Sequence, residues 1–151
     1  MLRIAKLTDY ATSLMARLAR VPERPMSAQA MSQEMDLPLP TVATLLKRLA
    51  RAGLVQSARG VGGGYWLARS PDAISVADVI VAIEGPVALT QCALGVGRCS
   101  VEAKCATRAN WQLISRAVQV ALEAVSLTDM AAPATRNLKF EALTRHESRK
   151  V

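Results

Sequence analysis

Three short amphipathic helices followed by a glycine-rich turn constrain the fold of this chain most. Apolar side chains recur at intervals of three and four residues over about 8–20, 28–35 and 40–52, which predicts three helices in quick succession. Two short apolar strands, around 54–55 and 65–67, flank the glycines and predict a β-hairpin. This order predicts a mainly helical fold with one small hairpin, a winged helix-turn-helix.

The second half of the chain predicts two more helices separated by a long loop. Ser75 and Asp78 have the spacing of a capping box, and Gly85 closes the helix that follows. We expect a winged helix-turn-helix domain over 1–85, a cysteine-containing loop over 86–107 and a long helix over 108–128. From 129 to 151 the periodicity fades, which predicts a flexible tail.

Positive charge is concentrated in the first half of the chain. The formal net charge is +7, and residues 1–70 hold ten Lys and Arg against four Asp and Glu. Residues that neutralise phosphates are needed where a protein grips DNA, so this bias favours a nucleic-acid partner for the winged helix.

The third helix and the hairpin carry the residues expected to contact double-stranded DNA. Opposite the apolar stripe of the helix lie hydroxyls that can approach bases and cations that can meet phosphates: Thr41, Thr44, Lys47, Arg48 and Arg51. In the hairpin we expect contacts from Arg59, Gly60, Gly62, Gly63, Gly64 and Tyr65. A dinucleotide-binding loop is disfavoured because Tyr65 stands where the third glycine of that motif belongs.

All three cysteines lie in the loop between the last two helices. Cys92, Cys99 and Cys105 are spaced C-x6-C-x5-C, unlike the C-x-x-C pairs of zinc ribbons or thioredoxin-like proteins. Thiolates are soft ligands that select iron–sulfur clusters, zinc or copper(I). A fourth ligand would be a carboxylate from Asp9, Glu84 or Glu102, since the single histidine is far away in the tail.

Three functions therefore stay open for the cysteines. They could hold a metal cluster that controls a DNA-binding protein, form a metal-free thiol switch, or bind zinc in a small interaction protein. An enzyme is disfavoured because no nucleophile–base pair stands out, and no small-molecule substrate is expected. The sequence shows neither a signal peptide nor an apolar run of membrane-spanning length, so we expect a cytoplasmic protein with no membrane partner.

Several motifs together make the chain resemble the Rrf2 family of bacterial winged-helix regulators, of the IscR and NsrR type. They are LTDYA at 7–11, LARAGLV at 49–55, RGVGGGY at 59–65, VADVI at 76–80, the three-cysteine loop, and a tryptophan six residues after the last cysteine. The likeness covers about residues 1–130. Within the family the chain is most similar to regulators of the SUF iron–sulfur assembly operon.

The resemblance implies a homodimer joined through the helix at 108–128. It implies a 2Fe–2S or 4Fe–4S cluster on Cys92, Cys99 and Cys105, and DNA contact through the third helix and the hairpin. NsrR-type members add an acidic ligand from the partner subunit, and Asp9 occupies the matching position. The chain departs from the IscR type because Arg108 replaces a histidine and Ala43 an acidic residue, and because the first cysteine gap is one residue longer.

Overall fold

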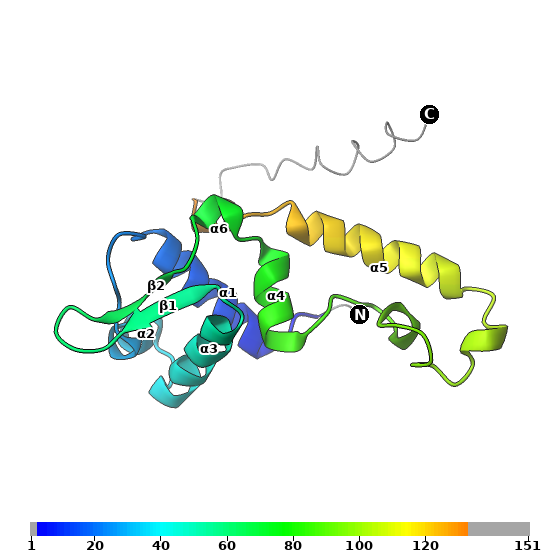
Figure 1. The fold of residues 1–151 in the computed structure, drawn as a ribbon, viewed down its shortest axis with the longest axis horizontal. Helices are drawn as coiled ribbons and strands as arrows, with labels where there is room; N and C mark the ends of the chain where they lie inside the picture. Colours follow the sequence, from blue (N-terminus) through cyan, green and yellow to red (C-terminus); the bar gives the residue numbers. More distant parts are fainter. Residues whose placement is uncertain (1–2, 133–151) are drawn as a thin grey trace.

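The computed structural model describes residues 3–132, which form the expected winged helix and an arm that extends from it (Figure 1). The elements run in the order α1 Lys6–Ala19, α2 Ala28–Met35, α3 Leu39–Arg51, β1 Val55–Ala58, β2 Gly64–Leu67, η1 Pro71–Ala73, α4 Val76–Glu84, η2 Gln91–Ala93, η3 Glu102–Lys104, α5 Arg108–Glu123 and α6 Leu127–Ala131. The mainly helical fold class predicted from the sequence is confirmed.

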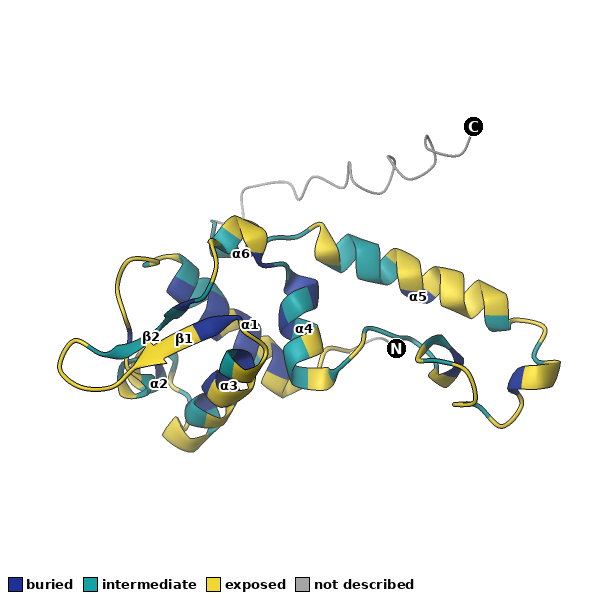
Figure 2. Cartoon of the chain, in the orientation of Figure 1, coloured by how far each residue is buried: buried dark blue, intermediate teal, exposed yellow. Residues whose placement is uncertain are grey.

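The hydrophobic core lies where α1, α2, α3 and the hairpin meet (Figure 2). Its fully buried side chains include Leu14, Met15, Leu18, Met31, Leu45, Leu46 and Leu49. Leu7 lies four residues before the buried Ala11, in register with the apolar stripe of α1, yet it is 44% exposed, whereas Thr8 beside it is fully buried. Thr8 faces α4, where its hydroxyl donates a hydrogen bond to Oε1 of Glu84.

Serine side chains cap α2 and α4, and the cap of α4 is the one predicted from the sequence. Oγ of Ser27 accepts a hydrogen bond from the amide of Ala30 at 3.0 Å, which fixes the start of α2. At the start of α4, Ser75 and Asp78 form a reciprocal capping box. These local contacts place α2 and α3 as a helix-turn-helix and set the direction in which α4 leaves the domain.

The hairpin is a two-stranded antiparallel sheet. Val55 pairs with Leu67 and Ala58 with Gly64, so the first strand runs to residue 58 and not over the predicted 54–55. Tyr65 also forms two backbone hydrogen bonds with Met26, of 2.8 and 3.0 Å. These bonds anchor the second strand to the loop between α1 and α2 and leave the turn at 59–63 projecting as a wing.

The tail was predicted to begin at 129, but residues 127–131 form α6, which packs on α1. Leu127 is fully buried in the core, and its amide donates to the carbonyl of Ile74 at 2.9 Å. Periodicity could not reveal so short a helix, because tertiary packing holds it. The rest of the predicted tail, with His146, lies outside the described residues.

The arm consists of the cysteine loop and α5. It leaves the winged helix after α4 and returns to it at Ser126, which pairs with Ser75. Only Ser115 of α5 is buried, and Leu113 is 70% exposed. Among residues 3–132, no helix has both the length and the apolar composition needed to cross a bilayer.

Candidate functional site

Helix α3 presents a polar face to solvent. Val42, Leu45, Leu46 and Leu49 are buried, whereas Thr44, Lys47, Arg48 and Arg51 are exposed and Thr41 is half-buried. The hydroxyl of Thr44 donates to the carbonyl of Pro40 at 2.8 Å, so its oxygen remains able to accept a hydrogen bond from outside the helix. The amphipathic pattern therefore places these five predicted DNA-contact residues away from the core.

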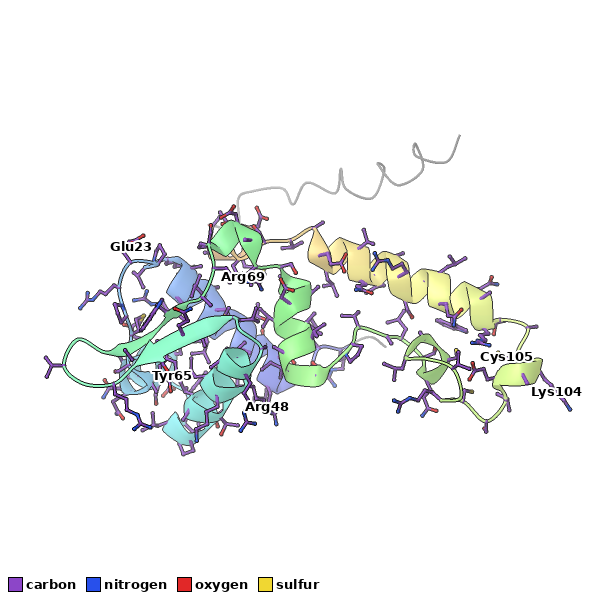
Figure 3. All side chains as sticks on the ribbon, in the orientation of Figure 1. Glu23, Arg48, Tyr65, Arg69, Lys104 and Cys105 are labelled. Carbon is purple, nitrogen blue, oxygen red and sulfur yellow. The ribbon has the colours of Figure 1, made fainter. Side chains whose placement is uncertain are left out.

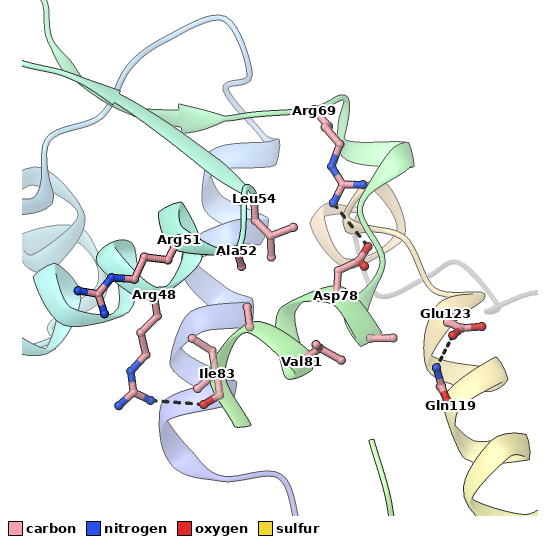
Figure 4. Close-up of a pocket in the computed structure, with 12 residues that line it drawn as sticks. Arg48, Arg51, Ala52, Leu54, Arg69, Asp78, Val81, Ile83, Gln119 and Glu123 are labelled. Carbon is pink, nitrogen blue, oxygen red and sulfur yellow. Dashed lines mark hydrogen bonds and ion pairs between the residues drawn. The ribbon is translucent and has the colours of Figure 1, made fainter. Parts of the chain in front are cut away.

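The two arginines of α3 are in different environments. Nη1 of Arg48 donates to the carbonyl oxygen of Ile83, in the last turn of α4, at 3.3 Å (Figure 4). Arg51, three residues later, has no side-chain partner among residues 3–132. Both line an open groove of about 600 Å³ with other residues that include Arg69, Asp78, Gln119 and Glu123. The cations and carboxylates of this groove are thus interleaved.

The wing depends on glycines at defined positions. Gly60 and Gly62 have φ of +95° and +77°, a left-handed conformation that side chains disfavour. A Cβ on Gly63 would lie 2.4 Å from the carbonyl oxygen of Ala58, and one on Gly64 would lie 2.8 Å from the backbone of Met26. Gly63 and Gly64 therefore allow close backbone packing, and Arg59 stays exposed at the wing.

Tyr65 was predicted to contact DNA, and the structure gives it a second role. Its backbone holds the wing to Met26, and its half-buried ring packs against the core. Figure 3 shows Tyr65 on the winged helix and Cys105 at the far end of the arm, with Arg48 between them along the long axis. Any influence of the cysteines on the predicted DNA-contact residues must therefore travel along the chain or through a second molecule.

The three cysteines lie on one loop, and all are free thiols. Cys92 is buried in η2, whereas Cys99 and Cys105 are half-buried. The sulfur of Cys105 lies 3.5 Å from the hydroxyl of Thr107, and hydrogen bonding from Thr107, with a smaller effect from Arg108, lowers the pKa of the Cys105 thiol. A lowered pKa favours the thiolate, which is both the metal ligand and the nucleophile.

Polar contacts tie the loop to α5. The hydroxyl of Ser115 accepts from the amide of Leu89 at 3.1 Å, and Nε2 of Gln112 donates to the carbonyl of Cys92 at 3.2 Å. Near the end of the loop, Glu102 is 9% exposed and forms an ion pair of 2.6 Å with Arg108. Its other oxygen accepts from the amide of Gly97 at 2.6 Å. The loop therefore has a defined fold of its own.

The fourth-ligand candidates do not join the cysteines within one chain. Glu102 is occupied by Arg108 and Gly97, and Glu84 accepts from Thr8 and from the amide of Ala5. Asp9 lines two grooves on the α1 side of the winged helix and is absent from the groove beside the loop. Within 3–132, no three Cys, His, Asp or Glu side chains are gathered as a metal site. The soft donor set fits iron, but the thiols must move closer to share one cluster.

A family model described as "Rrf2: Iron-dependent Transcriptional regulator" matches residues 4–133. The chain belongs to the Rrf2 family. This Rrf2 protein is 34% identical to the HTH-type transcriptional regulator IscR of Aliivibrio salmonicida over 83% of its own length and 76% of that relative.

Solved Rrf2 structures share the fold of this chain. CymR, the global cysteine regulator of B. subtilis, is similar with a TM-score of 0.70 and 33% identity over 87% of this chain and 97% of that one. IscR of T. potens gives a TM-score of 0.67 and 30% identity over 90% and 93%. This Rrf2 protein is thus a transcription regulator with a winged-helix fold, and, as the sequence led us to expect, not an enzyme.

Sequence reasoning missed two polar links of this Rrf2 protein. The Glu102–Arg108 pair joins residues on either side of Cys105. It lies in an irregular loop, where the sequence has no periodicity from which a contact could be predicted. The Arg48–Ile83 bond uses a backbone carbonyl, to which any residue type could contribute. A basic residue on α3 was visible in the sequence, but its neighbour on α4 depends on how the two helices cross.

Proposed function

We propose that the chain is a cytoplasmic, homodimeric DNA-binding regulator that carries an iron–sulfur cluster on Cys92, Cys99 and Cys105. Its DNA binding would respond to iron–sulfur, redox or nitric oxide status, and its targets would include iron–sulfur assembly genes, the SUF type among them. The observation that carries the proposal is that three free thiols share one loop, and that this loop connects the winged helix to an uncovered α5.

The dimer is supported by the exposed apolar side chains of α5. Trp111, Leu113 and Ile114 are all exposed large hydrophobics of a helix that packs only lightly on its own chain. A monomer rarely leaves such an apolar surface uncovered, because burying it releases about 25 cal/mol per Å². We propose that a second copy covers it, which would place two reading helices on a two-fold DNA site.

The DNA contacts are proposed for the wing and for the polar residues of α3 that make no hydrogen bond to α4. Thr41, Thr44, Lys47 and Arg51 would face the major groove, and Arg59 would reach a phosphate or the minor groove beside it. Gly60, Gly62, Gly63 and Gly64 would let the wing backbone approach the DNA. The basic excess of residues 1–70 would supply the non-specific part of the affinity.

The cluster would bring redox-active iron to the soft thiolate ligands of the loop. The chain's own contribution is to supply three thiolates, of which that of Cys105 is favoured by Thr107 and Arg108. Asp9 is proposed as the fourth ligand, donated by the second copy, because in its own chain it lies on α1 away from the loop. Gathering the thiols would require the loop to rearrange near Glu102.

A metal-free thiol switch is the second candidate, and it is favoured by the same lowered pKa of Cys105 and by the separated thiols. Anaerobic purification decides between the two. A brown protein with iron and acid-labile sulfide, which loses its visible absorbance when Cys99 is replaced by Ala, supports the cluster.

A colourless protein whose DNA binding changes on thiol oxidation would instead support the switch. Stoichiometric zinc without DNA retention would indicate a zinc-binding interaction protein. Promoter-fragment binding that is identical in all redox states of an iron-free protein would overturn the proposed function.

A further inference from the structure

The last turn of α4 is held from two sides. Nη1 of Arg48 on α3 donates to the carbonyl of Ile83 at 3.3 Å, and the carboxylate of Glu84 accepts from the amide of Ala5 at 3.3 Å. The final carbonyls of a helix have no partner within the helix and lie at the negative end of its dipole. The guanidinium of Arg48 therefore stabilises the end of α4 through its bond to the Ile83 carbonyl, the dashed line in Figure 4.

The same turn is where the cysteine loop begins. Gly85, with φ of +92°, ends α4, and Cys92 follows seven residues later. Leu89 and Cys92 are fixed to α5 through Ser115 and Gln112, so the segment between them and α4 is short and tethered at both ends. A displacement of Cys92 must be absorbed by this segment or be passed to the end of α4.

Helices α3 and α4 also pack through apolar side chains, but within residues 3–132 Arg48 is the one side chain of α3 that hydrogen-bonds to α4. Arg51 lies on the same helix, is exposed as well, and has no side-chain partner among residues 3–132. The two arginines therefore serve as test and control: Arg48 is bonded to α4, whereas Arg51 is available to contact DNA.

We propose that Arg48 is a positioning residue that couples the cysteine loop to the DNA-reading helix through the carbonyl of Ile83, and that it is not a DNA contact. The inference rests on the proposed function only in that the loop is taken as the sensor. DNA that fixes α3 would order the end of α4 and the first part of the loop, and a change in the loop would reach α3 by the same bond.

Hydrogen exchange tests the link in the full-length, reduced, metal-free protein. The probe is a duplex that the wild-type protein selects from a random pool, added at saturation. We expect the duplex to slow exchange of the amides of 84–92 in wild type and in Arg51→Ala by about threefold to tenfold, the range of the net contribution of one solvent-exposed hydrogen bond. In Arg48→Ala this protection should disappear, whereas Arg48→Lys, which keeps a charged donor, should retain most of it.

Affinity gives the second readout. Arg51→Ala should weaken binding of the duplex at least tenfold, whereas Arg48→Ala should weaken it less than threefold in the metal-free state. Equal losses of affinity with protection of 84–92 unchanged would overturn the proposal and make Arg48 an ordinary DNA contact. Absence of protection in wild type would overturn it as well.

Failure of the proposed function looks different. If anaerobic purification yields a protein without iron, and the metal-free protein nevertheless protects 84–92 through Arg48, the proposed cluster is excluded but the coupling stands. Because Arg48 is exposed, its variants are expected to fold, which an unchanged melting temperature would verify.

Discussion

Oε1 of Glu102 and Nη2 of Arg108 lie 2.6 Å apart, and the two residues stand three positions before and three positions after Cys105 in the sequence. The Glu102 side chain is only 8% exposed, so this pair holds a nearly buried charge at the end of the cysteine loop. The fold of the loop without metal therefore has an electrostatic anchor that lies among the residues proposed to bind iron.

Removing Arg108 should loosen the loop. Arg108→Ala leaves Glu102 without its cation, and we expect a loss of about 1–2 kcal/mol in the local free energy of unfolding, less than for a fully buried pair because Arg108 is partly exposed. Limited proteolysis of 86–107 measures it. The control is Arg116→Ala, which breaks an exposed pair with Glu123 at 3.6 Å and should change the rate of cleavage little. Equal cleavage in both variants would contradict the anchor.

The wing should contribute to phosphate neutralisation. Arg59→Ala is expected to weaken DNA binding and to lower the slope of log affinity against log salt by about one unit per protomer. Titrations at several salt concentrations provide the slope. Arg116→Ala, which removes the same charge from α5, should leave the slope unchanged, and an unchanged slope in Arg59→Ala would exclude a groove or phosphate role for the wing.

Two glycines of the wing should respond differently to alanine. Gly64→Ala forces a Cβ to 2.8 Å from the backbone of Met26 and should cost about 2–3 kcal/mol, whereas Gly60→Ala meets no atom within 4 Å and should cost about 1 kcal/mol for its φ alone. Urea unfolding gives both values. Equal losses of unfolding free energy in the two variants would mean that the backbone at Met26 and Tyr65 can move apart to accept a Cβ at position 64 without a free-energy penalty.

The Cys105 thiol should react at lower pH than an ordinary thiol. Hydrogen bonding from Thr107 stabilises the thiolate, so the pKa of Cys105 is lowered and a larger thiolate fraction exists at any pH below the ordinary value. The pH profile of Cys105 alkylation in the metal-free protein, followed by mass spectrometry, measures this. Thr107→Val should move the profile to higher pH. A profile that does not move would mean that Thr107 does not lower the pKa of Cys105.

The uncovered face of α5 should determine the oligomeric state. Leu113→Glu places a charge at a position that is 70% exposed in the single chain and is proposed to be buried in the dimer. Sedimentation should show a shift toward monomer. Val61→Glu, at an equally apolar but remote position on the wing, should keep the wild-type mass; a Leu113→Glu dimer of normal affinity would place the interface on another surface.

Local sequence signals predicted the winged helix well, because each of its elements carries its own marker. The stripe of Val42, Leu45, Leu46 and Leu49 defined α3, and Ser75 with Asp78 defined the start of α4. Local signals were insufficient where tertiary packing decides: Thr8 and not Leu7 is buried, and residues 129–131 of the expected tail belong to α6, which the buried Leu127 holds on the core. The links made by Arg48 and Arg108 likewise depend on how distant segments meet.

The pairing of Ser75 with Ser126 brings the end of the arm back to the start of α4, so the chain from α4 through the cysteine loop and α5 closes on itself. Residues can be inserted into or deleted from such a closed segment without disturbing the fold of the winged helix, because a surface loop whose ends stay together tolerates changes in length. The cysteine loop can therefore change in evolution separately from the polar residues of α3.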